Sequence, residues 1–258
     1  MNLRKSWVPR GSRRSTYSAP TIASAKDFGV RLMVARNSML PGSPPGFIRV
    51  QRERRNSGTS ATCSTTSQAA IDQAFAATQW VGEHGKEISV DSSRLAVAGN
   101  SVGGNMAAVV ALKAKEAGKP KLSFQLLLWP VTDANFDNVS YDHFAEGHFL
   151  TRNMMKWFWD NYTTDPKQRA ERFASPLRAT AEQLKGLPPT LIQTAEFDVL
   201  RDEGEAYARK LDAAGVTVTA VRYNGMIHDY GLLNPLAHVP AVQAAMRQAG
   251  NELKQHLR

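Results

Sequence analysis

The sequence predicts an α/β fold with a mainly parallel sheet, and three features of the 258-residue chain lead to it. Apolar runs of strand length alternate with segments whose apolar residues recur at helical spacing. The runs at 95–98 and 124–131 are largely apolar, which is typical of strands buried on both faces of a parallel sheet. A turn rich in small residues joins the first run to a helical segment. This order of strand, turn and helix is the repeating unit of α/β proteins.

The chain divides near residue 68 into two parts of different composition. Residues 1–60 hold 12 Lys and Arg against 2 Asp and Glu, whereas residues 61–258 hold the remaining 20 and 21. The second part is therefore almost neutral, which does not suit a nucleic-acid-binding domain. We interpret residues 1–67 as an atypical, basic and poorly ordered segment, in which only 29–36 and 46–52 look strand-like.

From residue 68 onward the expected elements alternate regularly. Apolar residues at helical spacing predict four helices, at 68–85, 102–118, 200–214 and 242–257. Continuous apolar runs predict four strands, at 95–98, 124–131, 188–197 and 218–223. We therefore expect residues 68–258 to form one catalytic domain.

An insertion at 136–165 interrupts this alternation. It crowds nine aromatic and apolar side chains into thirty residues: Phe144, Phe149, Leu150, Met154, Met155, Trp157, Phe158, Trp159 and Tyr162. Such a cluster is most often ordinary core. Its position between two strands also fits a small helical cap over an apolar pocket.

The composition argues against disulfide bonds, a cysteine-based metal site, a membrane span and a secretory signal. The single cysteine, Cys63, excludes an internal disulfide framework and offers no metal cluster. The sequence has no run of eighteen apolar residues and no apolar stretch typical of a secretory signal near its start. We expect a cytoplasmic protein without stable membrane insertion.

The motif with the clearest chemistry spans Gly99-Asn100-Ser101-Val102-Gly103, a match to G-x-S-x-G between a strand and a helix. A serine at the tip of such a turn has a strained backbone, and the flanking glycines avoid clashes of Cβ atoms. The helix N-terminus directs unpaired N–H groups at the same spot, so the Val102 N–H can stabilise an oxyanion. We expect Val102, Gly103 and Asn100 to form the oxyanion and substrate-binding side. The alternative, a phosphate loop, lacks the lysine and the G-x-G-x-x-G spacing.

Two further residues follow strand ends, where the reactive groups of parallel sheets collect. Ser101, Asp198 and His228 occur in the chain order of a serine hydrolase triad. His228 would accept the proton of Ser101, and Asp198 would orient the imidazole. Each also has an ordinary explanation, because an aspartate after a strand often caps a helix and a lone histidine often lies in a loop. The nearby acids that could replace Asp198 are Asp202, Glu203 and Asp229.

From about Gln68 to Arg258 the sequence resembles the bacterial branch of the hormone-sensitive-lipase family of α/β-hydrolase carboxylesterases. Four segments carry the resemblance: GNSVGGNMA around Ser101, LLWPVTD at 127–133, FDVLRDEGEAYARKL at 197–211 and GMIHDYGLLN at 225–234. The resemblance implies an α/β-hydrolase fold and a serine esterase acting on small short- to medium-chain acyl esters. It implies Ser101 as nucleophile, Asp198 as orienting acid and His228 as base, without metal or cofactor. Family members often pair through the last strand and helix, which implies a possible homodimer.

The sequence departs from the family upstream. Residues 1–67 contain neither the His-Gly-Gly-Gly motif that supplies most of the oxyanion hole nor a Tyr-Arg-Leu-Ala-Pro-Glu-like run, and Asn100 replaces the usual Asp. Loss of an oxyanion donor costs about 3 kcal/mol of transition-state stabilisation. The strand before Ser101 would also lack its neighbours and expose an open edge.

Two origins of residues 1–67 are compatible with this departure: an out-of-frame or rearranged segment, or a natural variant in which 29–36 and 46–52 form substitute strands.

Two functions are also compatible with the sequence. The chain is either a working serine carboxylesterase or a catalytically impaired or inert binding protein on the same fold. A peptidase of the same fold, and an RNA- or membrane-binding role for the basic segment, are weaker alternatives.

Overall fold

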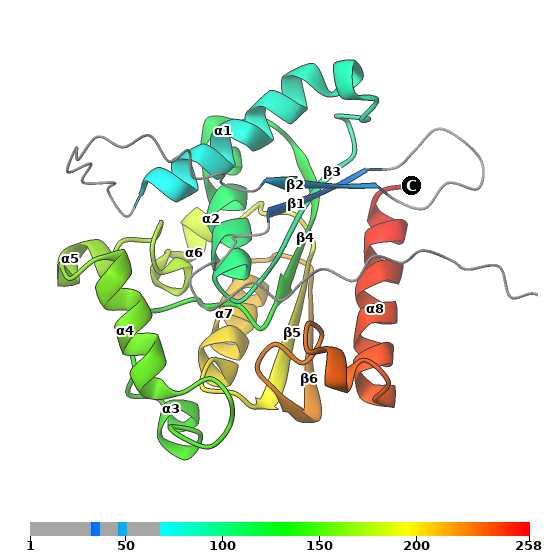
Figure 1. Cartoon of the computed structure of the whole chain (residues 1–258). Coiled ribbons are helices and arrows are strands. Elements are labelled where there is room, and N and C mark those ends of the chain that lie inside the picture. The colour runs from blue at the N-terminus through cyan, green and yellow to red at the C-terminus, as the bar shows by residue number, and fades with distance from the viewer. Residues whose placement is uncertain (1–31, 37–45, 51–67) are drawn as a thin grey trace, which may run out of the picture.

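The computed structural model describes residues 32–36, 46–50 and 68–258, and it is organised around a six-stranded sheet with helices on both faces (Figure 1). The strand order is β2-β1-β3-β4-β5-β6. The strands are β1 (Leu32–Arg36), β2 (Gly46–Val50), β3 (Leu95–Asn100), β4 (Leu122–Leu128), β5 (Thr190–Phe197) and β6 (Val218–Ile227). From β3 to β6 every neighbouring pair is parallel, which confirms the predicted α/β architecture.

The helices alternate with these strands. The α-helices are α1 (Ala69–His84), α2 (Val102–Ala117), α3 (Val139–His143), α4 (Arg152–Tyr162), α5 (Pro166–Arg169), α6 (Ala181–Leu184), α7 (Arg201–Ala213) and α8 (Pro240–His256). Short 3-10 turns are η1 (Gly85–Ile88), η2 (Pro176–Arg178) and η3 (Asn234–Leu236). The four helices expected from apolar spacing thus correspond to α1, α2, α7 and α8.

The two strand-like stretches near the start of the chain form β1 and β2. These strands pair with each other antiparallel, and β1 also pairs antiparallel with β3, placing Met33 opposite Ala98 and Val34 opposite Val97. The expectation that the strand before Ser101 has an open edge was therefore wrong, because β1 lies along that edge. The expected poor ordering of the rest of residues 1–67 falls outside the described residues.

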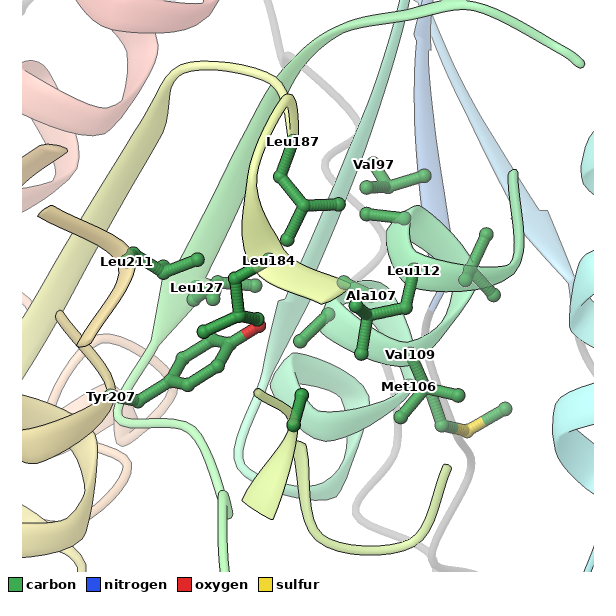
Figure 2. Packing of buried hydrophobic residues seen from close by; sticks show 14 of the residues in the cluster. Val97, Met106, Ala107, Val109, Leu112, Leu127, Leu184, Leu187, Tyr207 and Leu211 are labelled. Carbon is green, nitrogen blue, oxygen red and sulfur yellow. The ribbon is translucent and has the colours of Figure 1, made fainter. Parts of the chain in front are cut away.

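The strands β3, β4 and β5 are buried on both faces of the sheet, as their continuous apolar runs predicted. On one face, Val97 of β3 and Leu127 of β4 pack with α1, α2 and α7 in a single cluster (Figure 2). On the other face, Ala96 and Ala98 pack with Phe124 and with the C-terminal half of α8. The alternation of side chains along a strand explains why neighbouring residues of β3 belong to different clusters.

The insertion after β4 forms the helices α3 and α4 on the side of the molecule away from α8 (Figure 1). Tyr141, Met155 and Trp159 of this insertion are buried in a separate cluster, together with Val199 and Leu200 of the turn before α7. Other aromatic and apolar side chains of the insertion are exposed: Phe149, Met154 and Trp157. The crowded segment is thus partly core, and its role as a cap stays a prediction.

Candidate active site

Ser101 stands between β3 and α2 in a strained backbone conformation. Its φ of 53° and ψ of −120° lie outside the regions that a residue with a Cβ atom normally adopts. Its N–H donates to the carbonyl of Leu128, and its own carbonyl accepts from Val131 at 3.2 Å and from Asn105 at 3.1 Å. These backbone hydrogen bonds, to the end of β4, to the segment after it and to α2, hold Ser101 in its strained conformation. The hydroxyl therefore projects beyond the end of the sheet.

Position 99, at the strand side of the turn, has no room for a side chain. A Cβ atom placed on Gly99 would lie 2.0 Å from the carbonyl oxygen of Gly103 and 2.2 Å from its carbonyl carbon. Both atoms are backbone in the first turn of α2, so they cannot rotate aside. The motif spacing therefore reflects close contact between the strand end and the helix start.

Asp198 directly follows β5 and is almost completely buried, with 1% of its surface exposed. Its Oδ1 accepts the N–H of Leu200 at 2.9 Å, and its carbonyl accepts the N–H of Arg201. Its Oδ2 accepts from His228 Nδ1 at 2.8 Å. Asp198 is not the N-cap of α7, since that position belongs to Leu200 and has no side-chain bond, but one of its oxygens fixes the turn before the helix while the other contacts the histidine.

His228 lies just after β6, 3% exposed, and bridges the other two residues. Its Nδ1 faces Asp198, and its Nε2 is 3.0 Å from the Ser101 hydroxyl oxygen. The bond from Nδ1–H to a carboxylate leaves Nε2 as the acceptor for the serine proton. Ser101, His228 and Asp198 thus form one hydrogen-bonded chain, although Ser101 and His228 lie 127 positions apart in the sequence.

The environment of His228 favours its charged form despite burial. Burial is the largest influence and lowers the pKa of the imidazole, but the charge of Asp198, its hydrogen bond and the more distant Asp229 together outweigh burial and raise the pKa above 6.5. Asp229 Oδ1 is 3.8 Å from Nε2. The site can therefore hold an imidazolium when a proton arrives from Ser101.

The loop that carries His228 is anchored on both sides. Asp229, with φ of 59°, accepts the indole N–H of buried Trp129 at 2.7 Å. Tyr230 is fully buried, and its hydroxyl donates to Gln193 of β5. Trp129 and Asp229 were not expected to interact, since a contact between residues 100 positions apart leaves no local pattern in the sequence.

The three residues expected on the oxyanion side lie around Ser101. Asn100 ends β3, Val102 begins α2 with 44% of its surface exposed, and Gly103 is buried under Gly99. The N–H of Val102 belongs to the first turn of α2, where backbone donors have no partner within the helix. It is therefore available to a group bound at Ser101, and the positive end of the helix dipole adds to it.

The remaining candidate acids have other partners. Asp202 accepts from the N–H of Ser140 in α3 and from Arg201. Glu203 is 2% exposed, and its Oε1 accepts the N–H groups of Thr132 at 2.6 Å and Asp133 at 3.2 Å. Burial raises the pKa of Glu203 well above its ordinary value, although these two bonds act in the opposite direction. Neither acid reaches His228, so Asp198 remains the partner of the histidine.

Among residues 32–36, 46–50 and 68–258, no group of three or more His, Cys, Asp and Glu side chains is arranged to hold a metal ion. The same part of the chain contains no helix that is both long and apolar enough to cross a membrane.

Comparison with known proteins places residues 62–232 in a family described as alpha/beta hydrolase fold. The chain is 39% identical over 193 residues to carboxylesterase NlhH of Mycobacterium tuberculosis, an alignment that covers 73% of this chain and 59% of the relative. It is 33% identical over 191 residues to ethyl acetate hydrolase of Pseudomonas putida, covering 73% and 58%.

Solved structures agree with these sequence matches. A thermostable esterase from Pseudomonas putida superposes with a TM-score of 0.75 and is 78% identical over 76% of this chain and 61% of that one. A mutant of the esterase rPPE, equally similar, was crystallised in complex with (S)-Ac-CPA. The chain spans only 58% to 61% of the length of these relatives.

Proposed function

This chain belongs to the hormone-sensitive-lipase-like branch of the alpha/beta hydrolase fold family, and on that premise we propose that it is a serine carboxylesterase. The observation that carries the proposal is the hydrogen-bonded chain from Ser101 through His228 to Asp198, with distances of 3.0 and 2.8 Å. A serine hydroxyl is a weak nucleophile unless an oriented base accepts its proton, and this arrangement supplies both base and orienter.

The proposed reaction proceeds in two halves. Ser101 Oγ attacks the ester carbonyl carbon while its proton passes to His228 Nε2, and the carbonyl electron pair moves onto oxygen. The imidazolium then protonates the leaving alcohol as the carbonyl re-forms, which leaves an acyl group on Ser101. In the second half a water oxygen attacks the acyl carbonyl carbon while one of its protons passes to His228 Nε2. The bond from that carbon to Ser101 Oγ then breaks, His228 returns the proton to Oγ, and the acid departs. Asp198 holds the Nδ1–H tautomer throughout and stabilises the imidazolium.

The oxyanion in both halves needs donors close to Ser101. We propose the Val102 N–H as the first of these, with Asn100 and Gly103 forming the adjacent wall. This donor is supported by its place in the first turn of α2, where helix dipole and free N–H act together. Each donor of this kind is worth about 3 kcal/mol in the transition state.

The substrate class we propose is small esters with short- to medium-chain acyl groups. Two relatives support this substrate class. The Pseudomonas putida relative that is 33% identical to this chain is an ethyl acetate hydrolase, and the rPPE mutant was crystallised with (S)-Ac-CPA. The chemistry of the three residues needs neither metal nor cofactor.

A second candidate function has one observation in its favour. The sequence contains no His-Gly-Gly-Gly run, so the oxyanion donors that the family takes from that motif must come from elsewhere. If none are supplied, the chain would bind small esters without turning them over. The presence of all three hydrogen-bonded residues favours the esterase.

We also propose that the chain forms a homodimer through β6 and α8. β6 is the last strand of the sheet, and its residues Thr219, Ala220 and Arg222 are not buried. An exposed strand edge is a ready surface for pairing with another strand, and the mass of the protein in solution decides the matter.

The test of the esterase is hydrolysis of p-nitrophenyl butyrate by the purified chain beside Ser101→Ala. We expect turnover by the parent chain and loss of at least about 10³-fold in Ser101→Ala. Ser93→Ala is the matched control, because Ser93 is a serine of the loop before β3 whose hydroxyl donates to Asp91. Labelling with a fluorophosphonate probe adds a second readout, a mass increase located at Ser101. Folded protein that neither turns over nor takes the label refutes the esterase and supports the binding protein.

A further inference from the structure

Asp202 and Ser140 join the insertion to the first turn of α7. Asp202 Oδ2 accepts the backbone N–H of Ser140 at 2.8 Å, and its Oδ1 accepts from Arg201 Nε at 2.8 Å. In return the N–H of Asp202 donates to the Ser140 hydroxyl at 3.3 Å. The starts of α3 and α7 are therefore fastened to each other by reciprocal bonds, and the proposed acyl transfer uses none of them.

Ser140 also contacts the turn that presents Asp198. Its side chain is fully buried, and its hydroxyl lies 2.7 Å from the carbonyl oxygen of Val199. Val199 directly follows Asp198, and the same turn is closed from inside by the bond from the Leu200 N–H to Asp198 Oδ1. Two contacts thus hold the turn in place: the bond to the carboxylate of Asp198 within the turn, and the contact with the Ser140 hydroxyl of α3.

The position of this turn sets the distance between Asp198 and His228. Asp198 Oδ2 and His228 Nδ1 are 2.8 Å apart, and both groups are buried, so no water can replace a bond that is lost. The other groups that face His228 are the Ser101 hydroxyl at 3.0 Å and Asp229 at 3.8 Å. Of these groups, only Asp198 contacts Nδ1.

We propose that Ser140 and Asp202 are positioning residues that hold Asp198 in register with His228 and thereby couple the insertion to the active site. The inference rests on the proposed esterase function. Movement of α3 would shift the carbonyl of Val199 and loosen the bond between Asp198 and His228. A substrate that displaces the insertion would then alter the basicity of the histidine.

Ser140→Ala is the decisive variant, because it removes the hydroxyl without changing any charge near His228. Asp202→Ala is less direct, since loss of a negative charge could lower the pKa of His228 by itself. The matched control is Ser175→Ala. Ser175 is also fully buried, and its hydroxyl donates to the carbonyl of Arg169 at 2.6 Å, away from the Asp198 turn.

Two measurements on the full chain separate positioning from simple stabilisation. The first is the pKa of the His228 imidazole by NMR titration, and the second is kcat and KM for p-nitrophenyl butyrate. We expect Ser140→Ala to lower the pKa of His228, because burial then acts against a weakened bond to Asp198. We expect kcat to fall by about 10- to 100-fold, the usual effect of a misplacement near 1 Å, with KM nearly unchanged. Ser175→Ala should change neither.

Unchanged His228 titration in folded Ser140→Ala overturns the proposal, even if the variant melts at a lower temperature. If Ser140→Ala does not fold, Asp202→Asn carries the test, because its amide oxygen can still accept the Ser140 N–H. That variant should keep kcat within about threefold of the parent, whereas Asp202→Ala should lose as much as Ser140→Ala. Absence of turnover in the parent chain refutes the esterase alone, because the NMR titration still measures the coupling.

Discussion

Gly99→Ala should disable the site through backbone contact rather than through loss of a chemical group. The new Cβ would lie 2.0 Å from the carbonyl oxygen of Gly103, whereas real Cβ atoms keep at least 3.0 Å from their neighbours. The strand end and the first turn of α2 must therefore separate by about 1 Å. The contacting atoms are all backbone, so no side-chain rotation can absorb this shift.

The displaced turn carries Ser101, which lies between the two glycines. A movement of this size lengthens the 3.0 Å contact between Ser101 Oγ and His228 Nε2 beyond hydrogen-bonding distance. We expect kcat for p-nitrophenyl butyrate to fall by about 10²-fold or more. The free energy of unfolding should fall by about 1–3 kcal/mol, the usual cost of overpacking.

The assay compares initial rates and thermal melts of the parent chain, Gly99→Ala and Gly250→Ala. Gly250 lies in α8, and a Cβ atom added to it would have no neighbour within 4 Å, so alanine there should leave turnover unchanged and stabilise the helix by about 0.5–1 kcal/mol. Parent-like turnover in Gly99→Ala would refute the reasoning, since it would show that the turn tolerates a Cβ at that point.

Two further predictions concern stability and assembly. Because burial raises the pKa of Glu203, the folded chain binds a proton there that the unfolded chain has released above about pH 4.3, so this residue makes folding less favourable as pH rises. Glu203→Gln should therefore gain stability relative to the parent as the pH rises above about 4.3, by up to about 1.4 kcal/mol per pH unit, in urea melts; a stability difference that does not change with pH contradicts the assignment. The homodimer proposal predicts a mass near twice 28.3 kDa in sedimentation velocity, and a single monomeric species up to about 100 µM contradicts it.

The sequence predicted the four parallel strands of the sheet well, because strands buried on both faces leave continuous apolar runs, as at β4 and β5. It also singled out Ser101, Asp198 and His228, which the structure brings within hydrogen-bonding distance, while their catalytic roles stay a prediction. These three residues were selected because each follows the end of a predicted strand and because they occur in the chain order Ser, Asp, His.

The contacts that the sequence did not reveal join distant segments without a local pattern. Antiparallel pairing of β1 with β3 depends on backbone groups, which any residues can supply, so composition could not place it. Nothing in the local sequence around Ser140 indicates that its hydroxyl lies beside the carbonyl of Val199, 59 positions away. The same holds for Glu203, whose two partners lie 71 and 70 positions away.

β4 contributes no member of the hydrogen-bonded triplet, yet it runs between the strand that leads to Ser101 and the strand that leads to Asp198. Its width sets the span of roughly 10 Å that the side chains of Ser101, His228 and Asp198 must bridge, two strand spacings of about 4.8 Å. Backbone hydrogen bonds to both neighbouring strands fix this spacing. The span therefore does not depend on the size of the side chains that β4 buries on the two faces of the sheet, such as Leu127 and Phe124.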